Sequence, residues 1–191
     1  MKNKDFWGLM VNPFTRIAGW QAFGLGLVFV ILMGIVGAYG NVIFDGAIDM
    51  HLVKEISMIH SFEYLTVSTL TLVLVMWITA LFISKGFRFI DILGTMTLSK
   101  APFLLLAIAG FFTKMPDMSQ VMKNPMVILS STSFLILMII TVPVVIWTIA
   151  LMYNALKISC GVKGSKLTVA FIVALLVSEI ISKMLISYCL E

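Results

Sequence analysis

Three long intervals of this chain contain no charged side chain. The longest runs for 33 residues, from Asn124 to Leu156, and the other two are Ile17–Phe44 and Tyr64–Ser84. A transmembrane helix needs about 20 mostly apolar residues to cross a hydrocarbon core of roughly 30 Å. Because each interval reaches that length, the sequence predicts an integral membrane protein with three uninterrupted helical spans.

Two further apolar intervals are interrupted by isolated charges. Ile92–Thr113 contains Lys100, and Leu167–Leu190 contains Glu179 and Lys183. A central charge costs about 2.5–3.5 kcal/mol on insertion scales, which the surrounding Leu, Ile, Phe and Val offset. We therefore predict an all-α bundle of five transmembrane helices, at about residues 20–43, 64–84, 91–113, 126–153 and 167–189.

The composition excludes several other classes of protein. Hydrophobic residues make up 61% of the 191 residues, against about 45–50% in soluble domains, so a soluble protein is excluded. The 13 Lys and Arg are dispersed through short loops, so no basic patch for nucleic acid is expected. Cys160 and Cys189 form no CxxC motif, which argues against a zinc site or a redox pair.

Catalytic signatures are absent from the chain. It contains no GxxxxGK[ST], GxGxxG, HExxH or GxSxG motif, the patterns that mark common phosphate, dinucleotide, zinc and acyl-transfer sites. We therefore expect a non-enzymatic protein that carries no cofactor and no metal.

The loop charges predict an orientation, because Lys and Arg near span ends favour the cytoplasmic side. One side of the predicted bundle carries eight of them: Lys2, Lys4, Arg16, Lys85, Arg88, Lys157, Lys163 and Lys166. The other side carries three: Lys54, Lys114 and Lys123. The N-terminus is therefore predicted to be cytoplasmic and the C-terminus to lie outside. A cleaved signal peptide is the competing interpretation of the first span, but no clear A-x-A-like site follows it.

The first 16 residues differ from the spans in composition. Phe6, Trp7 and Phe14 lie among basic residues there, a mixture typical of a segment in the headgroup region. Pro13 is expected to separate this segment from the first span. We predict an interfacial segment over residues 1–16 and a five-helix transmembrane domain over residues 17–190.

The charges inside the predicted spans are the strongest functional candidates. Lys100 is expected about 14 Å from the inner face and Glu179 about 18 Å from it, so the two could form a buried ion pair. Lys183 lies one turn beyond Glu179 and is the competing partner. Such a set of charges serves either as a proton or ion relay or as a structural contact that holds the helices together. We favour the structural role, because no internal repeat of the kind common in transporters is visible.

Small residues recur every four positions on two of the predicted spans. Rows of this kind let helix backbones approach closely in a membrane. We expect both rows to be packing faces, against another span or a second copy of the chain. The rows are Ala18, Ala22, Gly26, Gly34 and Ala38 in the first span, and Ala170, Ala174, Ser178 and Ser182 in the fifth.

The first outer loop collects six titratable residues: Asp45, Asp49, His51, Glu55, His60 and Glu63. A helix would place His51 beside Glu55, and His60 beside Glu63. Zinc ligands usually show tighter spacing, so we assign no metal here. Leu52, Ile56 and Ile59 indicate instead an amphipathic helix on the outer surface.

Three segments accompany the predicted spans: Asn12-Pro13-Phe14 before the first span, "KGFRFIDILGTMTLSKAPFLLL" at the third, and "WTIALMYNALKISCGVKGSKL" between the fourth and fifth. With these segments the chain resembles the Yip1 family of membrane proteins over about residues 6–190. The resemblance implies the five-span fold, a prokaryotic cytoplasmic membrane and association with other membrane proteins. The D-L-Y-G-P and Y-G-Y motifs of eukaryotic members are absent, so binding of small GTPases is not expected to carry over.

Two function classes follow from these observations. The first is a membrane-organising adaptor or scaffold, whose partners are the lipid bilayer and either other membrane proteins or further copies of the chain. The second is a small ion or solute transporter, or a channel subunit, that uses Lys100 and Glu179.

Cysteine labelling tests the predicted topology. Since a helix rises about 1.5 Å per residue, the two native cysteines lie at opposite ends of the fifth predicted span. Cys160 should react from the cytoplasmic side and Cys189 from the outside. Labelling of both from one face would contradict the five-span topology.

Overall fold

The computed structural model describes residues 2–113, 118–124, 126 and 131–190, with side chains from residue 7 onward except those of 118 and 120. Lys114, which entered the predicted charge asymmetry, lies outside the described residues, as do 127–130 of the predicted fourth span. The side chains of Lys2 and Lys4 are likewise outside the description.

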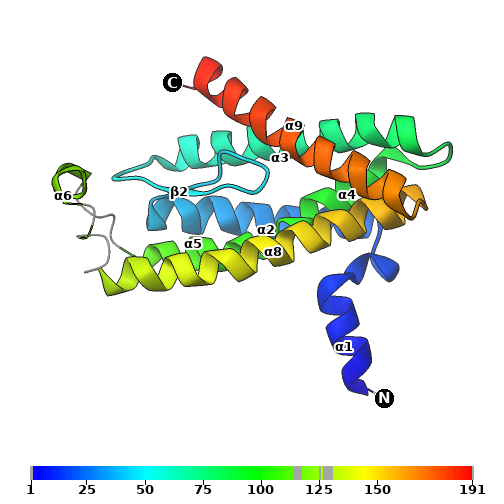
Figure 1. Ribbon diagram of the computed structural model, residues 1–191, viewed down its shortest axis with the longest axis horizontal. Coiled ribbons are helices and arrows are strands. Elements are labelled where there is room, and N and C mark those ends of the chain that lie inside the picture. The colour runs from blue at the N-terminus through cyan, green and yellow to red at the C-terminus, as the bar shows by residue number, and fades with distance from the viewer. Residues whose placement is uncertain (1, 114–117, 125, 127–130, 191) are drawn as a thin grey trace.

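Five helical segments are long and apolar enough to cross a membrane, and they lie side by side as an elongated bundle (Figure 1). This confirms the predicted all-α, multi-pass architecture. The spans are α2 (Gly19–Gly40), α3 (Met58–Ile83), α4 with α5 (Phe89–Ser99 and Phe103–Phe111), α8 (Thr132–Cys160) and α9 (Ser165–Cys189).

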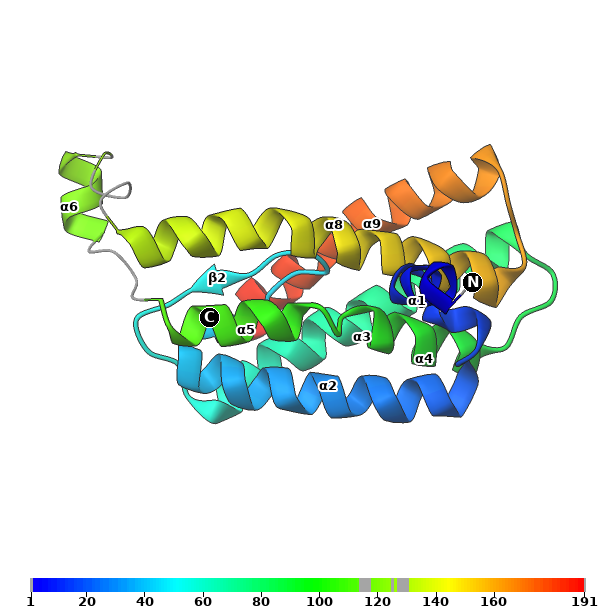
Figure 2. The ribbon, with the colours of Figure 1, turned by 90° about the horizontal axis from the view of Figure 1, so that it is seen from below.

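The third span is discontinuous. Between α4 and α5 the chain forms a tight turn at Lys100, Ala101 and Pro102, visible beside α2 in Figure 2. Proline has no N–H to donate and disfavours helical backbone in the residue before it. Pro102 therefore accounts for the break, and the break leaves Lys100 at the C-terminal end of α4.

The first outer loop is not the amphipathic helix that the sequence predicted. It forms a small hairpin, in which β1 (Val42–Ile43) pairs with β2 (His51–Leu52) in antiparallel register, and it turns back into the bundle. Val42, Phe44 and Ala47 are buried, and the Phe44 ring stacks on Phe103 of α5 at a centroid distance of 5.6 Å. Burial of these apolar side chains draws the loop inward, and α3 begins only after it.

Glycines bring α2 into backbone contact with the third span. A Cβ atom on Gly26 would lie 2.6 Å from the backbone nitrogen of Leu98 in α4. A Cβ on Gly40 would lie 2.9 Å from the backbone nitrogen of Phe111 in α5. Because α2 can approach this closely only where side chains are absent, Gly26, a member of the predicted small-residue row, packs against another span of the same chain.

The other members of the two rows vary in burial. In α2, Ala22 and Gly34 are buried, Ala38 is half-buried, and Ala18 is exposed just before the helix. In α9, Ala174, Ser178 and Ser182 are buried and Ala170 is half-buried. That face of α9 packs mainly against α3.

The N-terminal segment stands apart from the bundle. Helix α1 (Lys2–Val11) and the short 3₁₀ helix η1 (Pro13–Thr15) precede the first span. Figure 1 shows α1 projecting across the direction of the long helices, and Figure 2 shows it nearly end-on. The indole of Trp147 donates to the Met10 carbonyl at 2.8 Å, and the Asn154 amide donates to the Val11 carbonyl at 3.1 Å. These contacts with α8, together with buried Phe14, fix the base of α1.

The structure changes how the topology should be tested. The Cys160 side chain is only 5% exposed, so a labelling reagent would not reach it in the folded protein. Lys163 is exposed in the same loop, and Lys163→Cys in a background without native cysteines should react from the cytoplasmic side. Reaction from the outside would reverse the predicted orientation.

The close contact of α2 with α4 predicts different effects for two neighbouring glycines. Gly26→Ala should lower the free energy of unfolding by about 1–3 kcal/mol, the usual cost of overpacking, because the new methyl group meets the backbone at Leu98. Gly24 has no atom within 4 Å of its Cβ position, so Gly24→Ala should leave stability unchanged or raise it. Thermal unfolding of both variants in the same detergent makes the comparison, and equal melting temperatures would refute the contact.

Candidate functional site

Lys100 is the most unusual residue of the bundle, because its side chain is 0% exposed inside a membrane-spanning helix pair. Its ammonium donates to the hydroxyl of Ser68 in α3 at 2.9 Å and to the carbonyl of Gly46 in the outer loop at 3.3 Å. The Ser68 hydroxyl in turn donates to the Leu65 carbonyl at 3.2 Å. Lys100 therefore connects the third span, α3 and the loop.

Glu179 binds the same loop from the opposite side. Its Oε2 accepts a hydrogen bond from the backbone N–H of Ile48 at 3.1 Å. Its Oε1 lies 3.4 Å from the Lys183 ammonium, although the geometry of that pair is not that of a hydrogen bond. The predicted pairing of Glu179 with Lys183 is therefore present as an ion pair.

The direct ion pair predicted between Lys100 and Glu179 does not form. The Gly46 peptide lies between them: its carbonyl accepts from Lys100, and a Cβ on Gly46 would overlap the Glu179 carboxylate. Only glycine fits at this position without displacing the carboxylate. The expectation failed because no pattern in the sequence indicates that the outer loop enters the space between the two charges.

A second ion pair fastens the outer part of the loop. The Lys183 ammonium donates to Asp49 Oδ2 at 2.5 Å. Burial by itself would raise the pKa of Asp49, but the hydrogen bond from Lys183, the nearby His51 and the N–H of Met50 outweigh it and lower that pKa. The Asp49 carboxylate is thus held in its charged form, and Lys183 bridges two acids that are far apart in sequence.

Three acidic and imidazole groups gather at the mouth of the loop. Asp45, Asp49 and His51 place their ligand atoms within 4.8 Å of one another, with His51 Nδ1 3.1 Å from Asp45 Oδ1. Glu55 is exposed elsewhere in the loop, so the predicted side-by-side helical pair with His51 does not exist. Because the Lys183 ammonium already occupies Asp49, we assign no metal to this cluster.

Several other polar side chains of the spans serve local roles. His60 Nδ1 and Glu63 Oε2 lie 2.7 Å apart on α3, as their i,i+3 spacing predicts. The hydroxyls of Ser99, Ser178 and Ser182 donate to carbonyls of their own helices. They bind their own helix backbones, which is how a buried hydroxyl in a span is commonly satisfied.

The structure also contributes residues that the sequence did not identify. Ser68, Gly46 and Ile48 contact the intramembrane charges Lys100 and Glu179. Asp49 was identified as a titratable loop residue, but its contact with Lys183 was not predicted. The glycine at position 46, between Asp45 and Ala47, was the only local indication that the backbone approaches another group closely here. The backbone contacts of Gly46 and Ile48 have no signature in side-chain chemistry.

Comparison of the chain with known protein families, with curated proteins and with solved structures finds no significant match. The geometry of the buried centre therefore carries the functional argument by itself. Each of its charged groups binds backbone or side chains of the outer loop, and the arrangement as a whole holds that loop inside the bundle.

Removal of Lys100 should release the loop. Lys100→Met leaves the Gly46 carbonyl and the Ser68 hydroxyl without their charged donor, and a hydrogen bond to a charged group is worth about 1.5–3 kcal/mol. Ala47 is fully buried in the loop, so Ala47→Cys should resist a water-soluble thiol reagent in the parent and react at least tenfold faster beside Lys100→Met.

The exposed Lys85 provides the control, and Lys85→Met should leave the reaction rate at Ala47→Cys unchanged. Reaction at the parental rate in the Lys100→Met variant would show that the loop does not depend on this ammonium.

Proposed function

We propose that this chain is a Yip1-like, non-enzymatic membrane protein that acts as a membrane-organising adaptor, with its N-terminus in the cytoplasm of a prokaryotic cell. The observation that carries the proposal is the way in which the buried charges are used. Lys100 and Glu179 each bind backbone of the outer loop, so the polar interior stabilises the fold. This supports a role in which the protein presents fixed surfaces to its partners.

The N-terminal segment is the surface best suited to such a role. Helix α1 stands out sideways at the end of the bundle assigned to the cytoplasm, and Trp7 on it is 67% exposed. A helix across the bundle axis lies along the membrane surface, where tryptophan and basic residues are favoured. Its base is fixed to α8, which supports presentation of α1 to a neighbouring membrane protein.

A specific observation also favours the alternative of a small ion or solute transporter. Transporter sites are commonly built at interrupted transmembrane helices near the membrane centre, and Lys100 lies at the interruption between α4 and α5. In that case the loop would have to leave its position to expose Lys100, because the side chain is fully buried.

Site-specific photo-crosslinking in the native membrane tests the adaptor role. A photo-reactive amino acid at Trp7 should give discrete adducts with other membrane proteins or with a second copy of the chain. Val173 is exposed on α9, one of the spans, and provides the control position. Adducts of equal pattern and yield at both positions would indicate random collision and would count against an adaptor.

Flux measurements in liposomes address the alternative. An adaptor should conduct no more ions or protons than empty liposomes do. Flux above that background, lost in Lys100→Met although the variant still melts cooperatively, would replace the adaptor proposal with the transporter.

A further inference from the structure

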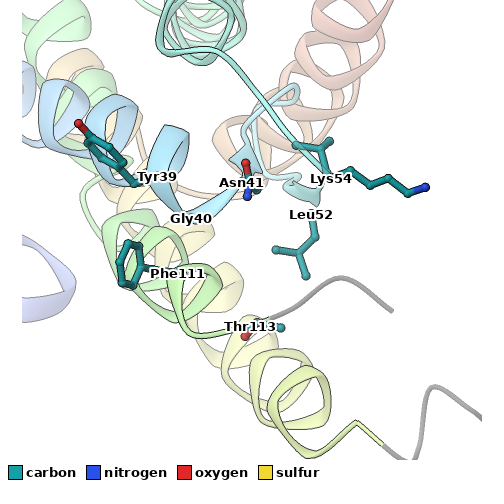
Figure 3. A pocket seen from close by; sticks show the side chains of 8 residues that line it. Tyr39, Gly40, Asn41, Leu52, Lys54, Phe111 and Thr113 are labelled. Carbon is teal, nitrogen blue, oxygen red and sulfur yellow. The ribbon is translucent and has the colours of Figure 1, made fainter. Parts of the chain in front are cut away.

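A pocket of about 320 Å³ opens where α2 and α5 end, on the side of the bundle opposite to α1. Figure 3 shows its walls. Tyr39, Gly40 and Asn41 come from the end of α2, Lys54 from the loop after β2, and Phe111 and Thr113 from the end of α5. The site is separate from the buried Lys100 centre, since the two have no residue in common.

The pocket lies at the level where a lipid headgroup would meet the protein. Both α2 and α5 belong to spans, so their ends mark the membrane boundary. Tyr39 is 68% exposed and the ring of Phe111 is also exposed, and aromatic rings at span ends are typical of this boundary. The acyl chains of a lipid bound here would lie along the exposed apolar faces of the same two helices.

One part of the pocket is suited to a cation. The C-terminal end of a helix carries a partial negative charge, and two such ends meet here, since a Cβ on Gly40 would lie 2.9 Å from the Phe111 backbone nitrogen. Among the described residues, no group donates a hydrogen bond to the carbonyl of Tyr39 or of Gly40. The faces of Tyr39 and Phe111 add the attraction of aromatic rings for an ammonium group.

The rim of the pocket is suited to an anion. Lys54 is exposed there and its side chain is directed outward (Figure 3), and within the described part of the chain it forms no ion pair or hydrogen bond through its ammonium. The backbone N–H of Val53 donates to the Asn41 carbonyl at 2.9 Å, which holds the segment bearing Lys54 beside the end of α2. An ammonium of this kind binds phosphate as a point charge.

From this charge pattern we infer that the pocket binds a phospholipid whose headgroup carries a primary ammonium next to its phosphate, as phosphatidylethanolamine does. The lipid ammonium donates to the free carbonyls of Tyr39 and Gly40 at the end of α2, beside the aromatic rings of the pocket, and its phosphate pairs with Lys54. A headgroup with only negative charge would meet the same carbonyls unfavourably. A quaternary ammonium would lack the N–H groups that these carbonyls accept.

Lipid titration of the delipidated, detergent-solubilised full chain tests the inference. Phosphatidylethanolamine should raise the melting temperature more than phosphatidylglycerol or phosphatidylcholine with identical acyl chains. Lys54→Gln should weaken the apparent affinity for phosphatidylethanolamine about tenfold, the loss expected for one hydrogen bond to a charged group. Tyr39→Leu, which keeps an apolar side chain, should reduce the preference for phosphatidylethanolamine over phosphatidylcholine.

Lys123 is an exposed lysine of α6 (Met118–Lys123) outside the pocket, and Lys123→Gln should titrate like the parent. The inference is overturned if phosphatidylglycerol stabilises the parent as strongly as phosphatidylethanolamine does, or if Lys54→Gln and Lys123→Gln behave alike. Equal stabilisation by soluble phosphoethanolamine would also overturn it, because the ligand would then not be a lipid.

Discussion

The fold depends on how one ammonium group is accommodated inside a membrane bundle. A charge removed from water is tolerated only where protein groups replace its hydration. Lys100 finds two oxygen acceptors, one on α3 and one on the outer loop. The loop therefore helps to accommodate the charge. Its Gly46 carbonyl is one of the two acceptors that the described residues offer to the Lys100 ammonium, and the other is Ser68 in α3. Glu179 then holds the next turn of the loop through the Ile48 amide, and the loop and the charges stabilise one another.

Close backbone packing makes that arrangement available. Between α2 and the third span, glycines allow contact at both Gly26 and Gly40, and the break at Pro102 divides the third span into two short helices that can each follow α2. The same break places Lys100 at the end of α4, where its side chain can reach toward the loop. The break of the third span at Pro102 thus allows both the close packing on α2 and the burial of Lys100. Close packing of this kind matters in a membrane, because no hydrophobic effect brings helices together there.

The sequence predicted the architecture well because the requirements of a bilayer act on composition over long intervals. Three spans followed from uncharged stretches and two from apolar stretches with one or two charges. Gly26 was correctly predicted to lie on a packing face. The partner of Lys100 was not predictable in the same way. Its acceptor in the loop is the backbone carbonyl of Gly46, a group that every residue has. The loop enters the bundle through the buried side chains of Phe44 and Ala47, whereas the prediction of a surface helix rested on Leu52, Ile56 and Ile59. Predicting Lys183 as a partner of Glu179 succeeded because their i,i+4 spacing is local, whereas the contact of Lys183 with Asp49 joins two distant segments.

The outer loop is a fixed part of the bundle, although it lies outside the spans in the sequence. Amide hydrogen exchange of the chain in lipid nanodiscs measures this directly, because the Ile48 N–H is hydrogen-bonded to Glu179 at 3.1 Å and slow exchange reports such bonds. We expect the Ile48 amide to exchange as slowly as amides within α3 and α9. Exchange as fast as that of an unstructured peptide would show that the loop is free, and it would contradict the role assigned to Lys100 and Glu179.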